Sequence, residues 1–122
     1  MAYRILIYED QRGRAPILEY FRAMEADHSK EARIRLTKAQ DYINLLKERG
    51  TILPNSICKH FSDKKHSWLW ELRPGGDRVL FFAWKDGSFV LLHAFEKKSQ
   101  KTPQREIDRA EREYNDWRER YG

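Results

Sequence analysis

The spacing of hydrophobic residues changes along the chain, and these changes predict where helices and strands lie. Residues 3–8 hold a short apolar run that is typical of a strand. Apolar residues then recur every three or four positions across residues 17–24 and 32–46, which predicts two amphipathic helices. Pro16 suits the first turn of one helix and Ser29 the N-cap of the other. We therefore expect a strand followed by a helical hairpin.

After residue 52 the apolar residues follow the two-residue alternation of strands. Strands are predicted at residues 57–61, 68–73, 78–84 and 88–95. The sequences Pro74-Gly75-Gly76-Asp77 and Asp86-Gly87 are turn signals that separate the last three strands. Strict alternation places Leu69, Glu71 and Arg73 on one face and Trp68, Trp70 and Leu72 on the other. It also places Phe89, Leu91, His93 and Phe95 on a single face of the last strand.

A final helix follows the last strand. Thr102 and Pro103 are suited to cap and start it, and apolar residues recur at helical spacing from Ile107 to Tyr121. The predicted order is one strand, two helices, four strands and one helix. This order is typical of an α+β fold with a mostly antiparallel sheet, and residues 1–122 are expected to form one domain.

Composition narrows the class of protein. The single Cys58 excludes a disulfide framework within the chain and any multi-cysteine zinc site. Neither a membrane-length apolar run nor a signal-peptide pattern is present, so we expect a cytoplasmic protein with no membrane partner. The net charge is +5, and residues 59–101 alone carry nine Lys and Arg against five Asp and Glu. This local excess of positive charge indicates an anionic partner.

Residues with the chemistry to act on a phosphodiester gather in that basic region. Arg73 and Arg78 flank the Gly-Gly turn, and guanidinium groups bind phosphate oxygens bidentately. Six lysines of this region are also candidates. Lys59 lies in the predicted strand at residues 57–61, Lys64 and Lys65 lie in the loop after it, and Lys97, Lys98 and Lys101 follow the last strand. His93 is a candidate general acid or base, and Phe95 is a candidate ring for stacking on an unpaired base.

Each of these residues also has an ordinary structural interpretation. The arginines suit weak surface ion pairs with Glu71 and Asp77, and the lysines suit a solvated loop. A lone histidine in an apolar strand is more often a buried core residue than a catalyst, and burial of His93 would transfer the role of base to the lysines. The sequence holds no Gly-rich phosphate loop and no paired His or Cys motif, so we expect neither a metal nor a cofactor.

The sequence resembles the RelE/ParE toxin superfamily, particularly its HigB-like, phage-derived branch. The resemblance rests on Trp70-Glu71-Leu72-Arg73, on Arg78-Val79-Leu80-Phe81-Phe82, on the segment from Leu91 to Pro103, and on Glu106-Ile107-Asp108-Arg109-Ala110. It covers nearly the whole chain. It implies the toxin of a type II toxin–antitoxin pair, with a helix-turn-helix antitoxin as its protein partner.

The resemblance also implies an activity. Its relatives are mostly metal-independent endoribonucleases that cut mRNA on the ribosome, by attack of the 2′-hydroxyl on the adjacent phosphate. On this sequence Arg73 matches the arginine that contacts the scissile phosphate, and Lys98 matches the basic residue that stabilises the transition state. Arg78 and Lys97 match basic positions nearby. The general base is left between His93 and Lys97.

Two other functions remain open. A ParE-like toxin would bind DNA gyrase without catalysis, and an inactive relative would act only as a binding module. Mapping of message cleavage on translating ribosomes separates the first of these from a ribonuclease.

Overall fold

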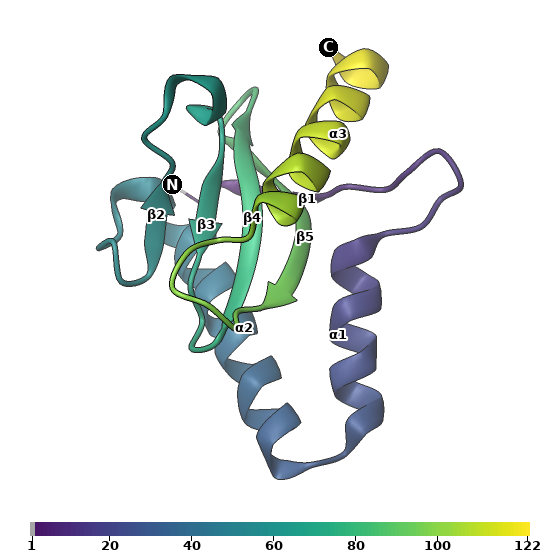
Figure 1. Ribbon diagram of the computed structural model, residues 1–122, viewed down its shortest axis with the longest axis vertical. Helices are drawn as coiled ribbons and strands as arrows, with labels where there is room; N and C mark the ends of the chain where they lie inside the picture. The colour runs from purple at the N-terminus through teal and green to yellow at the C-terminus, as the bar shows by residue number, and fades with distance from the viewer. Residues whose placement is uncertain (1) are drawn as a thin grey trace.

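The computed structural model describes residues 2–122 and has a twisted five-stranded sheet covered by helices on both faces (Figure 1). The strands are β1 (Arg4–Ile7), β2 (Cys58–His60), β3 (Trp70–Leu72), β4 (Asp77–Trp84) and β5 (Ser88–Glu96). The helices are α1 (Pro16–Asp27), α2 (Lys30–Arg49) and α3 (Gln104–Tyr121), with short 3₁₀ turns at Gly50–Ile52 and Lys64–His66. None of the helices in the described part of the chain is long and apolar enough to cross a membrane.

The sheet has the order β1-β5-β4-β3-β2. β1 runs parallel to β5, and the other three neighbouring pairs are antiparallel. Parallel strands need a long connection between them, and the α1–α2 hairpin lies in the segment that connects β1 to β5. The predicted α+β fold with a mostly antiparallel sheet is confirmed.

The helical hairpin begins and ends as its sequence predicts. The Ser29 hydroxyl accepts a hydrogen bond from the backbone N–H of Ala32 at 3.0 Å and so caps α2. Gly50 ends α2 with a φ of +67°, and a Cβ there would lie 2.8 Å from the ring of Tyr3. Only glycine satisfies both the backbone angle and this close contact.

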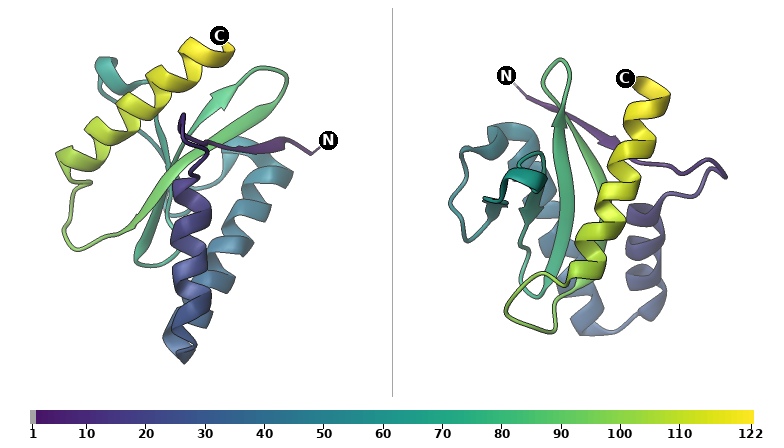
Figure 2. Two further views of the ribbon diagram at one scale, coloured as in Figure 1. Left: turned by 90° about the vertical axis from the view of Figure 1, so that its right-hand side faces the viewer. Right: turned by 45° about the horizontal axis from the view of Figure 1, so that its top comes forward.

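Two hydrophobic clusters hold the layers together. One lies between the sheet and the α1–α2 hairpin and includes Ile17, Leu46, Leu72, Phe81 and Leu91. The other lies between the opposite face of the sheet and α3 and includes Leu80, Phe82, Leu92, Ala110 and Trp117. The two views of Figure 2 show α3 crossing one face while α1 and α2 pack on the other.

A β-bulge in β5 overturns the predicted alternation of that strand. Leu80 pairs with His93 whereas Phe81 pairs with Leu91, so Leu92 is an extra residue between them. Phe89 and Leu91 face the helical hairpin as expected, but Phe95 lies in the cluster beneath α3 and His93 contacts α3. The prediction that all four residues share a face is therefore wrong, because the bulge shifts the alternation by one position.

The predicted alternation also fails at the start of β3. The strand begins only at Trp70, and Trp68 instead follows the 3₁₀ turn at Lys64–His66. Trp70 packs with the hairpin cluster, whereas Trp68 stacks on Tyr114 of α3 with ring centroids 4.0 Å apart. Leu69 and Glu71 both face the α3 side of the sheet, and the alternation correctly predicts that they share a face.

Candidate functional site

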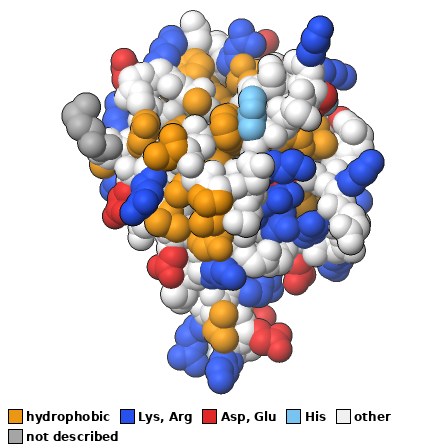
Figure 3. Space-filling model, turned by 90° about the vertical axis from the view of Figure 1, so that its left-hand side faces the viewer, with side chains coloured by type: hydrophobic (Ala, Val, Ile, Leu, Met, Phe, Trp, Pro, Cys, Tyr) orange, Lys and Arg blue, Asp and Glu red, His pale blue; other side chains and the backbone are white. Residues whose placement is uncertain are grey.

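A polar cleft of about 330 Å³ lies on the α3 face of the sheet, beside the N-terminus of α3. Three segments supply its walls: β2 with the residue after it, β3 with Arg73, and the loop from Lys97 into α3. The lining residues are Lys59, Phe61, Glu71, Arg73, Lys97, Gln100, Lys101, Thr102, Gln104 and Ile107. Figure 3 shows a group of Lys and Arg side chains right of centre on one face of the molecule, beside hydrophobic side chains. The cleft brings together cations that are up to 42 positions apart in sequence, from Lys59 to Lys101.

Arg73 stands at the end of β3, where it lines the cleft. Its Nε donates to Oε1 of Glu71 at 3.2 Å, and its Nη1 donates to the backbone oxygen of Asn55 at 3.4 Å. Its side chain keeps 25% of its exposure, so the guanidinium is oriented by protein yet accessible to a ligand. This arrangement suits recognition of a phosphate group.

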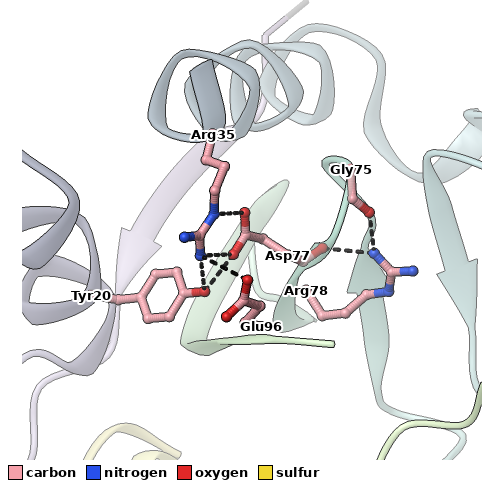
Figure 4. A network of polar contacts seen from close by, with 6 residues as sticks. All are labelled: Tyr20, Arg35, Gly75, Asp77, Arg78 and Glu96. Atoms are coloured by element: carbon pink, nitrogen blue, oxygen red, sulfur yellow. Dashed lines mark hydrogen bonds and ion pairs between the residues drawn. The ribbon is translucent and has the colours of Figure 1, made fainter. Parts of the chain in front are cut away.

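Arg78 lies on the other side of the Gly-Gly turn and is buried. Its Nη1 donates to the backbone oxygens of Gly75 and Asp77, both at 2.8 Å (Figure 4). Burial lowers the pKa of this guanidinium, while the nearby Glu71 carboxylate opposes the shift. Arg78 therefore holds the turn in shape, and the cleft does not include it.

A second buried carboxylate fastens the same turn to the helical hairpin. Asp77 accepts from Arg35 through both of its oxygens, with Nε at 3.1 Å and Nη2 at 2.7 Å, and it accepts a further bond from the hydroxyl of Tyr20 (Figure 4). Burial first, and the bond to Asp77 second, raise the pKa of Tyr20. The backbone N–H of Lys97 donates to Gly76 at 2.8 Å, so the turn also anchors the start of the lysine loop.

The six predicted lysines fall into three groups. Lys59, Lys97 and Lys101 line the cleft. Lys98 is exposed and lines an adjoining recess with Lys97, Ser99 and Gln100. Lys64 and Lys65 lie in the 3₁₀ turn at Lys64–His66, are exposed, and do not line the cleft.

His93 and Phe95 do not reach the cleft. His93 is fully buried, with Nδ1 2.6 Å from Glu113 Oε1 and Nε2 3.1 Å from Glu106 Oε1. Both glutamates are on α3, so His93 bridges the sheet to that helix. Phe95 is 8% exposed and belongs to the cluster beneath α3, so its ring is not presented for stacking on a base. Both positions follow from the bulge at Leu92.

Two residues of the cleft escape prediction from sequence. Glu71 is 1% exposed and lines the cleft, where it contacts Arg73, Arg78 and Thr102. The sequence does contain one indication that Glu71 is buried: by alternation it shares a strand face with the apolar Leu69. Thr102 was expected to cap α3, but this is wrong, since its hydroxyl donates to Oε2 of Glu71 at 2.5 Å and Pro103 precedes the helix without a side-chain cap.

Within residues 2–122 no group of three or more His, Cys, Asp or Glu side chains is arranged to hold a metal ion. The polar groups that line the cleft are four cationic side chains, the buried Glu71 carboxylate, the Thr102 hydroxyl and two glutamine amides.

Comparison with known proteins assigns the chain to a family and relates its fold to a solved structure. The family model described as phage-derived protein Gp49-like matches residues 19–115. No curated protein matches the chain. Among solved structures, the archaeal RelE–RelB complex from Pyrococcus horikoshii OT3 matches with a TM-score of 0.50 and 16% identity, over 83% of this chain and 100% of that chain. This likeness concerns the fold, which has the RelE architecture. The chain belongs to the phage-derived Gp49-like family of RelE-like toxins, within the RelE/ParE superfamily.

Proposed function

We propose that the protein is a metal-independent endoribonuclease that cuts mRNA on the ribosome and so inhibits translation. The observation that carries the proposal is the convergence of Lys59, Arg73, Lys97 and Lys101 on one cleft. A cleft lined by several cations, one of them an oriented guanidinium, is suited to binding the RNA backbone around a scissile phosphate.

The reaction divides between groups of the cleft and Lys98, which lines the adjoining recess. The 2′-oxygen attacks the adjacent phosphorus, the bond from phosphorus to the 5′-oxygen breaks, and the products are a 2′,3′-cyclic phosphate and a 5′-hydroxyl. Arg73 binds the non-bridging phosphate oxygens, and the ammonium groups of Lys98 and Lys101 stabilise the charge that develops on them. An ammonium group also supplies the proton that the departing 5′-oxygen takes up.

The proton of the 2′-hydroxyl needs an acceptor within the cleft. Burial of His93 between two glutamates removes it from this role, so the assignment passes to Lys97, which lines the same cleft as Arg73. The neutral amine of Lys97 is the form that accepts this proton.

The partners follow from the same proposal. The matched solved structure is a complex of RelE with RelB, which supports a protein antitoxin as the partner of this chain. We assign the chain to the HigB-like branch, whose antitoxins are helix-turn-helix proteins. The ribosome supplies the mRNA held in an extended, unpaired form.

The test is a folded variant that lacks the phosphate-binding and charge-stabilising groups. Arg73→Ala together with Lys98→Ala should relieve growth arrest and lower cleavage of a reporter mRNA on purified translating ribosomes by about 10³-fold or more. Lys47→Ala together with Lys85→Ala removes two exposed cations outside the cleft and should leave cleavage unchanged.

Mapping of the message ends distinguishes this function from gyrase inhibition. Cuts within codons that depend on the ribosome support the proposal. Intact message accompanied by induced DNA damage would identify a toxin of the ParE kind, and full toxicity of the folded double variant would remove Arg73 and Lys98 from the mechanism.

A further inference from the structure

Glu71 occupies an unusual position for a carboxylate in a site that binds an anion. It lies on β3 directly opposite Lys59 of β2, and 1% of its side chain is exposed. A buried carboxylate next to a phosphate site weakens anion binding by repulsion. We therefore expect a structural role of Glu71 that offsets the weaker anion binding.

The contacts of Glu71 join the two halves of the cleft. Oε1 accepts from Arg73 Nε at 3.2 Å and lies 3.4 Å from Arg78 Nε. Oε2 accepts from the Thr102 hydroxyl at 2.5 Å. The arginines belong to the β3–β4 hairpin, whereas Thr102 ends the loop that carries Lys97, Lys98 and Lys101. One side chain thus connects the hairpin cations to the lysine loop.

No other side-chain hydrogen bond in residues 2–122 makes this connection. Within that part of the chain, the remaining hydrogen bonds of the segment 97–102 are a backbone bond from Lys97 to Gly76 and a bond from the Ser99 hydroxyl to Lys101 within the loop. The start of the loop is therefore fixed by backbone, and its end is fixed to the sheet through Thr102 and Glu71.

We infer that Glu71 is a positioning residue, which orients the Arg73 guanidinium and holds the lysine loop against it through Thr102. This inference rests on the proposed ribonuclease activity. Glu71 itself neither binds the phosphate nor takes a proton. By fixing cations from two segments in one geometry, it places their charge where the transition state forms, because a misplacement of about 1 Å is enough to lower a rate by about 10²-fold.

The first test is Glu71→Gln, which keeps the shape of the side chain and removes its charge. Single-turnover cleavage of a reporter mRNA on purified translating ribosomes should slow by about 10²-fold at saturating protein, while the half-saturating concentration changes less than about threefold. Glu48→Gln removes the same charge from the exposed face of α2, and it should cleave at the wild-type rate.

The second test is Thr102→Val, which leaves Glu71 and both arginines in place and removes only the hydroxyl bond. We expect the rate to fall by about tenfold and the effect of Glu71→Gln to be smaller when Thr102→Val is already present, since the two changes break one connection. Thermal unfolding of each variant shows that the comparison is made on folded protein, and Thr102→Val keeps the test valid if Glu71→Gln does not fold.

The pH profile separates positioning from catalysis by Glu71. A positioning role predicts a slower Glu71→Gln enzyme whose rate depends on pH as in the wild type. Loss of the acidic limb of the profile would make Glu71 the general base and overturn the inference, as would a wild-type rate in folded Glu71→Gln. A wild-type protein that cleaves no message would instead reject the proposed function itself.

Discussion

The effect of a buried polar residue on stability depends on whether it has a hydrogen-bonding partner. His93, Glu71 and Asp77 are all buried polar groups, and each has charged or hydroxyl partners within hydrogen-bonding distance. Removing one member of such a set leaves the others buried without a partner. The resulting loss in the free energy of unfolding is larger than the contribution of an exposed ion pair. Cys58 differs because it is buried without a polar partner, and burial raises the pKa of its thiol to about 11.

His93→Gln tests the structural interpretation of that histidine. Both ring nitrogens face carboxylate oxygens, so the substitution should lower the free energy of unfolding by about 3 kcal/mol, measured by urea denaturation. Cleavage assayed at a temperature where the variant is folded should stay within about threefold of wild type. A folded variant with no activity would restore His93 as the general base.

Cys58 gives a second expectation at this scale. Its thiol is 1% exposed, and the raised pKa means that hardly any thiolate exists at pH 8. Modification by a thiol reagent at pH 8 should therefore be far slower in the native protein than in urea, where the thiol is free. A native rate equal to that in urea would show that the β2 edge opens readily.

The elements are held together by polar contacts at their ends as well as by the two apolar clusters. Asp77 fixes the β3–β4 turn to α2 through Arg35. Asp116 of α3 accepts from the hydroxyl of Tyr8, just after β1, at 2.7 Å and from Arg120 at 2.8 Å. The Tyr8 bond leads the contacts that hold the pKa of Asp116 below its ordinary value.

The Asp116 contacts predict a pH-dependent stability. A lowered pKa in the folded state means that the carboxylate stabilises the protein above its unfolded pKa, near 4, and that this contribution is lost as the pH falls through the folded value. Asp116→Asn should cost about 1–2 kcal/mol at pH 7 and progressively less below about pH 4, measured by urea unfolding at each pH. The exposed Asp41→Asn serves as the control. An equal loss of unfolding free energy at pH 7 and pH 3 would contradict stabilisation by the ionised Asp116 carboxylate.

At the scale of the whole molecule, the sheet brings basic residues from distant segments to one face. Lys59 comes from β2, Arg73 from the end of β3, and Lys97 and Lys101 from the loop after β5. The surplus of positive charge in residues 59–101 therefore becomes a local feature of the surface. On the proposed function, this surface should bind single-stranded RNA with release of counterions, and its affinity should depend on salt.

Salt dependence measures how many cations contact the RNA backbone. For a single-stranded oligonucleotide, the logarithm of the binding constant should fall linearly with the logarithm of salt concentration. Lys59→Ala with Lys101→Ala should reduce the slope by about 1.4, since each phosphate contact on a single strand contributes about 0.7. Lys47→Ala with Lys85→Ala should leave the slope unchanged, and an equal reduction in this pair would indicate diffuse attraction instead of a site.

Prediction from sequence worked best where a local pattern decides the structure. The helical hairpin, the Ser29 cap, the stop at Gly50 and the Asp86-Gly87 turn all depend on neighbours a few positions apart. Lys59, Arg73, Lys97 and Lys101 are site candidates from the sequence that line one cleft, and their roles stay predictions. The face of His93 was predicted incorrectly, because a single extra residue at Leu92 reverses the alternation and leaves no clear signal in an apolar run.

The sequence by itself determined the order of elements, their approximate bounds and the charge of the region that forms the site, because these depend on local periodicity and composition. Tertiary structure alone decided that Arg78 is buried while Arg73 is accessible. It also decided that His93 contacts α3 rather than the cleft, and that Glu71 joins the hairpin to the lysine loop. These outcomes depend on which distant segments meet. The exposure and partners of a charged side chain are set by those contacts, and no spacing along the chain encodes them directly.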